Sequence, residues 1–272
     1  KSIGINRLSI GVQSFYDEDL KFMNRSHNSK QALESIKLAQ KNGLENITVD
    51  LIYGVPGLTN KLWERNLSII KEIGINHFSA YALTVEPKTK LDYLIKTKKI
   101  PPLKDKKTEI QFKILQEKAE AMGYTQYEIS SFCKDHFFSE HNSSYWKGKW
   151  YLGIGPSAHS FNGENRQWNV KSNSNYIKQI NNQKKHYETE RLSEKEKYNE
   201  YVLTSLRTIW GIDTNYLKEN FDSKINNHFE KLIRKWEVNK SVIRKGECIF
   251  LAKNGMLFAD AISSDLFFIQ DS

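Results

Sequence analysis

The sequence predicts an α/β protein with a parallel sheet, followed by a smaller, mainly helical domain. Two observations predict the sheet: short apolar, strand-like segments alternate with amphipathic helical segments, and a glycine closes each helix. Strands and helices that alternate at this length form parallel sheets with right-handed crossovers. The third observation is that residues 171–197 are rich in Asn, Lys, Gln and Glu. This change of composition predicts a linker between a first domain, 1–170, and a second, 198–272.

Three strand–helix units open the chain, and each has a polar residue near the end of its strand. Gln13 follows the strand 7–12, Asp50 interrupts the buried apolar strand 47–52, and Thr84 follows the strand 77–83. Because β/α barrels place their chemistry at the carboxyl edge of the strands, these three residues predict a functional edge. The alternative for Asp50 is a carboxylate that only caps the following loop.

The helices between these strands have recognisable ends. Ser29 is the predicted cap of the first helix and Gly43 its stop, and Thr59 or Asn60 caps the second. A third helix over 104–122 leads into a strand over 124–129.

Past residue 197, three helices are followed by two strands and a final helix, which is the order of a winged helix. The predicted helices begin near Tyr198, Thr214 and Ser223, and the strands near Ser241 and Ile249. Winged helices often bind DNA, but no Arg/Lys-rich recognition face stands out, so a packing or lid module is the preferred interpretation.

Composition sets further limits. No apolar run approaches the length of roughly 20 residues that a membrane span needs. The net charge of +9 is compatible with nucleic acid, a membrane surface or an anionic ligand, or only with lysines spread along the chain. Cys133 and Cys248 are the only cysteines, too few for a disulfide framework, which is typical of a reducing cytoplasm.

Several motifs identify a family when they are taken together. They are Ser9-Ile-Gly-Val-Gln-Ser-Phe15, Asn24-Arg25, Asp50-Leu-Ile-Tyr-Gly-Val-Pro56 and Tyr151-Leu-Gly-Ile-Gly155. In combination they resemble radical SAM proteins of the oxygen-independent coproporphyrinogen III oxidase group, and the resemblance covers nearly the whole chain. One further motif, His141-Asn-Ser-Ser-Tyr-Trp146, is carried by the haem chaperone (HemW-type) branch and not by the true oxidases.

The resemblance implies S-adenosylmethionine and a 4Fe–4S cluster as cofactors of the full-length protein. The cysteine triplet that binds the cluster is not in this sequence, which begins Lys1-Ser2-Ile3. We therefore expect a partial barrel without its first units, as a piece of a longer protein. The residues that the resemblance places at S-adenosylmethionine are Gln13, Arg25, Asp50, Ile52 and Thr84, with His159 near the cofactor.

The resulting hypothesis is a cytoplasmic haem chaperone that binds haem and transfers it to haem-accepting proteins. His141 is the first candidate for the haem iron ligand and His159 the second, because imidazole is a common axial ligand. The alternative for His141 is a structural side chain that fixes a loop. Peripheral membrane contact is a further expected interaction, and no nucleic acid is expected.

The alternative function is coproporphyrinogen III oxidase activity in porphyrin biosynthesis. It would need the full-length protein with its cluster, so enzymatic activity of this chain is left open. A nucleic-acid-binding winged-helix protein ranks third.

Overall fold

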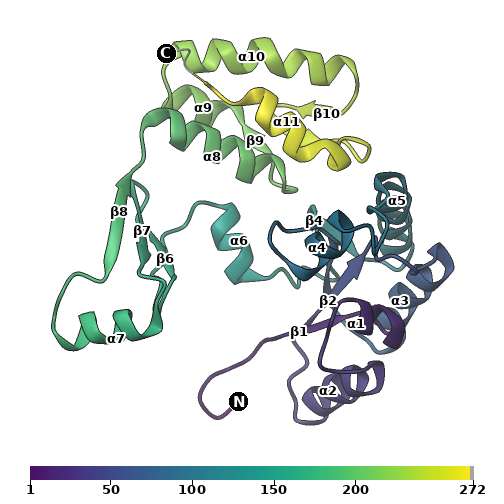
Figure 1. The fold of residues 1–272 in the computed structure, drawn as a ribbon. Helices are drawn as coiled ribbons and strands as arrows, with labels where there is room; N and C mark the ends of the chain where they lie inside the picture. The colour runs from purple at the N-terminus through teal and green to yellow at the C-terminus, as the bar shows by residue number, and fades with distance from the viewer. Residues whose placement is uncertain (270–272) are drawn as a thin grey trace. The chain divides into compact units, whose positions relative to one another are not determined.

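The computed structural model describes residues 1–269 and divides the chain into two compact units. The first unit is Lys1–Phe138 and the second begins at Ser139 (Figure 1). This division lies earlier in the chain than the boundary predicted after residue 170. The reason is strand pairing: β7 (Asn165–Asn169) pairs with β8 (Tyr187–Arg191), which lies inside the predicted linker. The domain limits drawn from composition therefore remain predictions.

The first unit contains a five-stranded sheet in the order β1-β2-β3-β5-β4. The strands β1 (Leu8–Gln13), β2 (Ile47–Tyr53) and β3 (His77–Ala82) pair in parallel, which confirms the predicted parallel sheet. The sequence did not reveal β5 (Ser131–Cys133), which runs antiparallel between β3 and β4 (Thr125–Glu128). At three residues, β5 is too short to produce a periodic signal.

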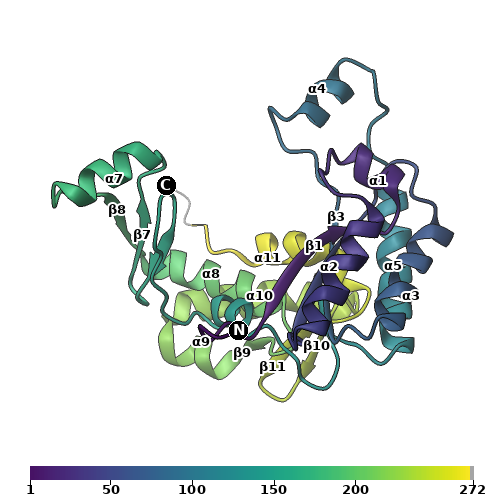
Figure 2. The ribbon, with the colours of Figure 1, turned by 90° about the horizontal axis from the view of Figure 1, so that it is seen from below.

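Helices cover one face of this sheet. They are α2 (Ser29–Lys41), α3 (Asn60–Glu72) and α5 (Asp105–Ala121), which Figure 2 shows on the same side of the strands. The short helices α1 (Asp17–Phe22) and α4 (Lys90–Lys96) were not predicted. The alternation of β2 follows this arrangement, since Val49 and Leu51 are fully buried whereas Asp50 and Ile52 are only partly buried. The polar side chains of β2 thus lie on the face without helices.

Two helix ends test the cap predictions. The predicted cap Ser29 is wrong. The Gln31 N–H donates to Asn28 Oδ1, and the Asn28 N–H donates to Gln31 Oε1. This capping box needs the residue before Ser29. For α3 the cap is Thr59, whose hydroxyl accepts from the Leu62 N–H at 3.2 Å.

The second unit begins with α6 (Glu140–Trp146) and a three-stranded antiparallel sheet. That sheet has the order β6-β7-β8, where β6 is His159–Phe161, and α7 (Asn173–Asn181) connects β7 to β8. Helices followed by a hairpin complete the unit, as predicted for the C-terminal domain. These elements are α8 (Glu194–Leu206), β9 (Ile212–Asp213), α9 (Thr214–Asn220), α10 (Ser223–Val238), β10 (Val242–Lys245), β11 (Cys248–Leu251), the 3₁₀ helix Gly255–Phe258 and α11 (Ala259–Leu266).

Among residues 1–269, none of the helices combines the length and apolarity that crossing a membrane requires.

Candidate functional site

Four predicted site residues meet at the carboxyl edge of the three parallel strands. Gln13 ends β1 and pairs in register with Leu51 of β2, between Asp50 and Ile52. Thr84 follows β3, where the Leu83 N–H donates to the Tyr53 carbonyl oxygen at 2.8 Å. Strand pairing therefore brings Gln13, Asp50, Ile52 and Thr84 to one edge of the first unit, as the sequence predicted.

Asp50 lies in an environment that disfavours its charge. Burial raises the pKa of its carboxyl above the ordinary value, although hydrogen bonds from Ser9 and Ser79 and the nearby charge of Arg7 act in the opposite direction. The Ser9 hydroxyl donates to the carboxylate at 3.0 Å. Sequence reasoning missed both serines. Ser79 pairs in register with Asp50, and Ser9 pairs with Thr48, two residues before Asp50 on the same strand. Alternation along β1 and β3 was the signal that could have found them.

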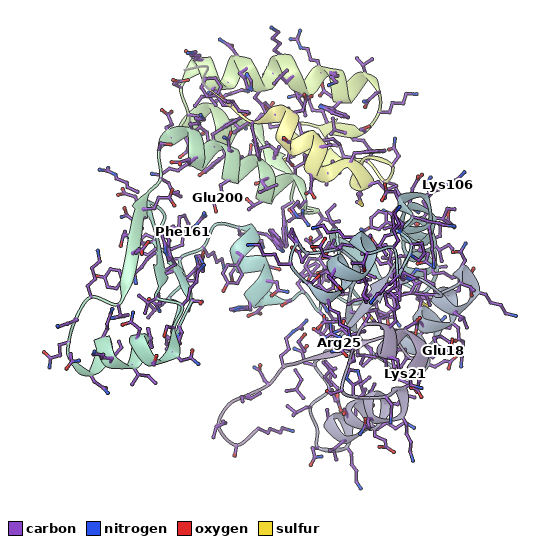
Figure 3. All side chains as sticks on the ribbon, in the orientation of Figure 1. Glu18, Lys21, Arg25, Lys106, Phe161 and Glu200 are labelled. Carbon is purple, nitrogen blue, oxygen red and sulfur yellow. The ribbon has the colours of Figure 1, made fainter. Side chains whose placement is uncertain are left out.

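Arg25 lies in the loop between α1 and α2 and is exposed (Figure 3). Its backbone N–H donates to the Leu20 carbonyl oxygen at 2.9 Å. Two residues later, the Nε2 of His27 lies 3.1 Å from the Val12 carbonyl oxygen, which ties the loop to the end of β1. The Arg25 guanidinium forms no ion pair with another described residue, so it remains available for an anionic ligand.

The loop after β2 is held by the fully buried side chain of Gln111 on α5. The Gly54 N–H donates to Gln111 Oε1 at 2.7 Å, and Gln111 Nε2 donates to the Leu58 carbonyl oxygen at 2.9 Å. Lys107, one turn earlier on α5, donates to the Val55 carbonyl oxygen at 2.7 Å. These bonds fix the backbone that follows Asp50.

In the second unit, His141 belongs to a row of aromatic rings that meet edge-on or tilted. Its ring meets that of Tyr145 edge-on at 5.0 Å, and Tyr145 meets Tyr151 at 4.7 Å. Tyr151 in turn lies 6.1 Å from Phe161 of β6. All distances are between ring centroids. His141 is exposed, and its spacing of four residues from Tyr145 on one helix explains the contact.

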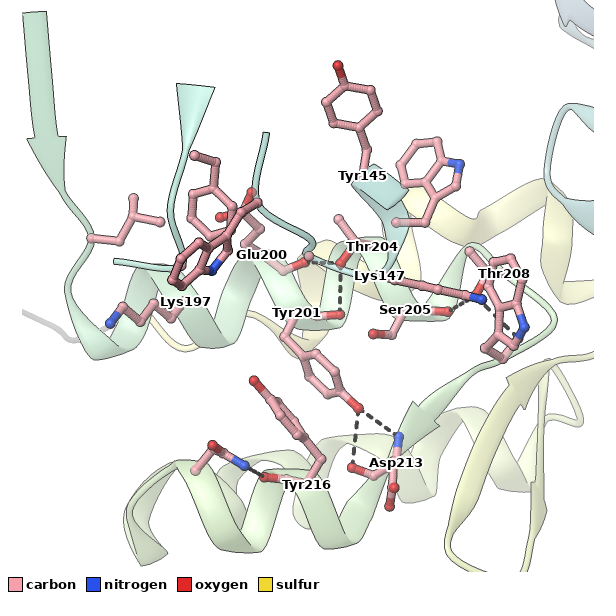
Figure 4. Close-up of a pocket in the computed structure, with 18 of the residues that line it drawn as sticks. Tyr145, Lys147, Lys197, Glu200, Tyr201, Thr204, Ser205, Thr208, Asp213 and Tyr216 are labelled. Atoms are coloured by element: carbon pink, nitrogen blue, oxygen red, sulfur yellow. Dashed lines mark hydrogen bonds between the residues drawn. The ribbon is translucent and has the colours of Figure 1, made fainter. Parts of the chain in front are cut away.

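This row leads to a cavity of about 1160 Å³ within the second unit. Aromatic side chains from distant parts of the sequence line it, together with Cys248 (Figure 4). They are Tyr145, Trp146, Trp150, Tyr151, Phe161, Tyr201, Trp210, Tyr216 and Phe221.

A hydrogen bond, an ion pair and a cation–π contact involve residues that line the cavity. The Tyr201 hydroxyl accepts from the Asp213 N–H at 2.9 Å, which joins α8 to the start of α9. Glu200, which faces the cavity with Phe161, pairs with Arg166 of β7 (Figure 3). The ammonium of Lys147 lies 4.0 Å from the ring centroid of Trp210. Sequence reasoning did not connect Tyr201, Trp210 or Tyr216 with the motif that contains Tyr145 and Trp146, because these residues share no period or motif with it.

His159 begins β6 and pairs in register with Trp168, whose ring lies 6.4 Å from the imidazole. Neither His159 nor His141 is among the cavity-lining residues, although each is close in sequence to one that is. The backbone before β6 is tightly packed: a Cβ on Gly153 would lie 2.2 Å from the His159 carbonyl oxygen.

No group of three or more His, Cys, Asp or Glu side chains within residues 1–269 is placed to hold a metal ion. Cys133 and Cys248 belong to different units, and burial raises the pKa of the Cys133 thiol to about 11. An iron–sulfur cluster is held by several cysteine thiolates, so the residues present do not fit one.

Comparison with known proteins agrees with the observed fold. The radical SAM superfamily model matches residues 1–69. Heme chaperone HemW of Bacillus subtilis is 32% identical over 265 residues, which cover 96% of this chain and 69% of that protein. HemW of Lactococcus lactis is also 32% identical, over 84% of this chain and 59% of that protein.

Among solved structures, coproporphyrinogen III oxidase (HemN) from Escherichia coli, described as a radical SAM enzyme, matches with a TM-score of 0.75. It is 22% identical, and the match covers 98% of this chain and 65% of that one. At this identity the likeness shows a shared fold. The fold and the matched region define a radical SAM protein. Within that superfamily, the chain belongs to the HemW family. It spans roughly three fifths to two thirds of the length of these relatives.

Proposed function

We propose that this protein binds haem and delivers it to acceptor proteins, on a radical SAM scaffold. The observation that carries the proposal is the aromatic cavity of the second unit, reached from His141 through Tyr145. Ligand cavities are commonly 300–1,000 Å³ and mostly apolar with a few polar groups, so about 1160 Å³ is enough space for a haem. The relatives named heme chaperones support the same assignment.

His141 is the preferred iron ligand. Its ring is exposed, and its partner Tyr145 lines the cavity, so a haem held between the aromatic walls could present its iron at the edge near α6. Haem iron commonly accepts an imidazole nitrogen. His159 is the second candidate, because it precedes the cavity residue Phe161 on β6 by one alternation of the strand.

The edge of the first unit fits S-adenosylmethionine by the chemistry of its side chains. Arg25 would hold the methionine carboxylate with charge-assisted hydrogen bonds, while Gln13 and Asp50 would bind ribose hydroxyls. Ile52 and Thr84 would flank the adenosine. When bound, the cofactor would supply a deoxyadenosyl group. The partly buried Asp50, already held by Ser9, is the structural feature that supports this arrangement.

The proposed partners are haem-accepting proteins, and the proposed location is the cytoplasm. The acceptors would be haem-requiring proteins of the cytoplasm, with peripheral contact to a membrane surface. A cluster would have to be held by cysteines other than Cys133 and Cys248, so no step of haem binding is assigned to it.

A haem titration of this chain tests the proposal. We expect saturable binding with a Soret band that shifts relative to free haem. His141→Ala should weaken the affinity about tenfold or more, since one axial bond is lost. His186→Ala is the matched control, because His186 also meets a tyrosine ring edge-on, at 5.3 Å from Tyr176. Tyr176 does not line the cavity, whereas Tyr145, the partner of His141, does.

Trp150→Ala separates the cavity from the ligand. Trp150 lines the cavity and is 76% exposed, so its removal should lower haem affinity without unfolding the unit. If His141→Ala and Trp150→Ala both bind haem as the unmodified chain does, the cavity is not the haem site and the proposal is wrong.

A further inference from the structure

The helix α7 carries an apolar face that is exposed in the described part of the second unit. Ile177 and Ile180 are 58% and 43% exposed, and residues three apart lie on one side of a helix. No residue of α7 is buried. The helix connects β7 to β8 and lies at the far end of their sheet from α8 (Figure 1, Figure 2). It is anchored by the Tyr176 hydroxyl, which accepts from the Gly155 N–H at 3.2 Å.

The chain segment that contains α7 carries basic side chains and no acidic ones. Between Glu164 and Glu188 the sequence contains no Asp or Glu. Four exposed lysines lie in this stretch, and none of them forms an ion pair with another described residue. They are Lys171, Lys178, Lys184 and Lys185.

We propose that α7 and these four lysines form a surface that binds anionic lipid headgroups. A helix with exposed apolar side chains and basic flanks lies in a membrane interface, with the apolar face toward the acyl chains and the lysines at the headgroups. An acidic protein partner would use the lysines, but it offers less reason for two isoleucines to face outward at the end of the sheet. This inference rests on the proposed peripheral membrane contact and gives it a location, independent of haem binding.

The contribution of the lysine charges and that of the apolar face of α7 can be separated by substitution. Each lysine near an anionic surface changes the partition coefficient about fivefold, so K184Q/K185Q should lower it about 30-fold. Ile177→Gln with Ile180→Gln should lower it about tenfold or more, because burial of the apolar face is lost. Raising the salt concentration should weaken binding, since headgroup charges are screened.

The experiment is co-sedimentation of the chain with vesicles of phosphatidylcholine mixed with phosphatidylglycerol, and with phosphatidylcholine alone. K37Q/K41Q on α2 removes the same charge from exposed positions elsewhere, and Leu38→Gln, 62% exposed, is the control for the isoleucines. The expected result is binding to the anionic vesicles only, lost in the α7 variants and kept in the controls.

Absence of binding to anionic vesicles, equal binding to both vesicle types, or equal losses in the α7 and control variants would overturn the proposal. A haem titration of the same variants keeps the two ideas distinguishable. The α7 variants should bind haem as the unmodified chain does, so a failure on vesicles leaves the haem assignment untouched.

Discussion

His77 makes the stability of the first unit depend on pH. It begins β3 and is 1% exposed, with Nε2 2.7 Å from the Tyr127 hydroxyl and no hydrogen-bond partner for Nδ1 among the described residues. Burial, assisted by the charge of Arg7, lowers the pKa of the imidazole from 6.5 to about 3. The folded protein therefore keeps His77 neutral, whereas the unfolded chain takes up a proton near pH 6.5.

The sign follows from this difference. Because the unfolded state binds more protons, the contribution of His77 to the free energy of unfolding has its full value above pH 6.5. It decreases continuously as the pH falls toward 3. At pH 5 the loss relative to pH 7 is about 2 kcal/mol from this one residue. His77→Gln, which can still hydrogen-bond Tyr127, should remove that part of the acid sensitivity and leave the contributions of other groups.

The assay is urea denaturation at pH 7 and pH 5. Unfolding of the first unit is followed by hydrogen–deuterium exchange in peptides that come from that unit alone. After the protein has equilibrated in urea at each pH, a short deuterium pulse at one fixed pH labels the unfolded molecules. Peptides that cover β2 and β3 then report the unfolded fraction of the first unit, without a contribution from the second unit. The unmodified chain should lose about 2 kcal/mol more than His77→Gln between the two pH values. Equal losses in the two proteins would refute the reasoning, since they would mean that His77 is protonated in the folded state.

Three further changes test the sites. Asp50→Asn should raise the melting temperature at pH 7, because a raised carboxyl pKa means that the charged form of Asp50 destabilises the folded state. This increase in melting temperature should vanish as the pH falls from the raised pKa of the folded state toward the ordinary value of 3.8, where the carboxyl becomes neutral. An unchanged melting temperature at pH 7 would contradict this. Gln111→Leu removes the acceptor of the Gly54 N–H and should lower the urea-derived free energy of unfolding by about 1–3 kcal/mol. Gly153→Ala should destabilise the second unit by about 1–3 kcal/mol in calorimetry, through the clash with the His159 carbonyl, and a stability equal to that of the unmodified chain would show that the loop can yield.

The edge of the first unit was predictable because it depends on order along the chain. Gln13, Asp50 and Thr84 each follow or end a strand of a repeating unit, and parallel pairing fixes where such positions meet. The sequence was less informative about what surrounds Asp50. Serine is common and has no strong strand preference, so Ser9 and Ser79 gained meaning only from the register that placed them beside the carboxylate.

The second unit shows the opposite case. The motif from His141 to Trp146 is local and was found, but the cavity beside it is built from α6, β6, α8 and α9. No spacing rule links Trp146 to Trp210 or Tyr216, because tertiary packing alone brings them together. Composition likewise marks residues 171–197 as polar, whereas hydrogen bonds with β7 make β8 part of a sheet.

Because the motif is local and the cavity is formed by tertiary packing, variants in the two can test the iron ligand and the cavity wall separately. A substitution at His141 removes the proposed iron ligand and the edge-on contact with the Tyr145 ring together, because the two rings are in contact. Loss of haem binding in that variant alone would therefore fit either a lost ligand or a displaced wall. Trp150 also lines the cavity, and it lies in the loop after α6 rather than on that helix. If Trp150→Ala weakens haem binding without moving the Soret band, while His141→Ala moves the band, the wall and the ligand are separate contributions. If both variants weaken binding and neither moves the band, His141 acts through Tyr145, and His159 becomes the ligand to test.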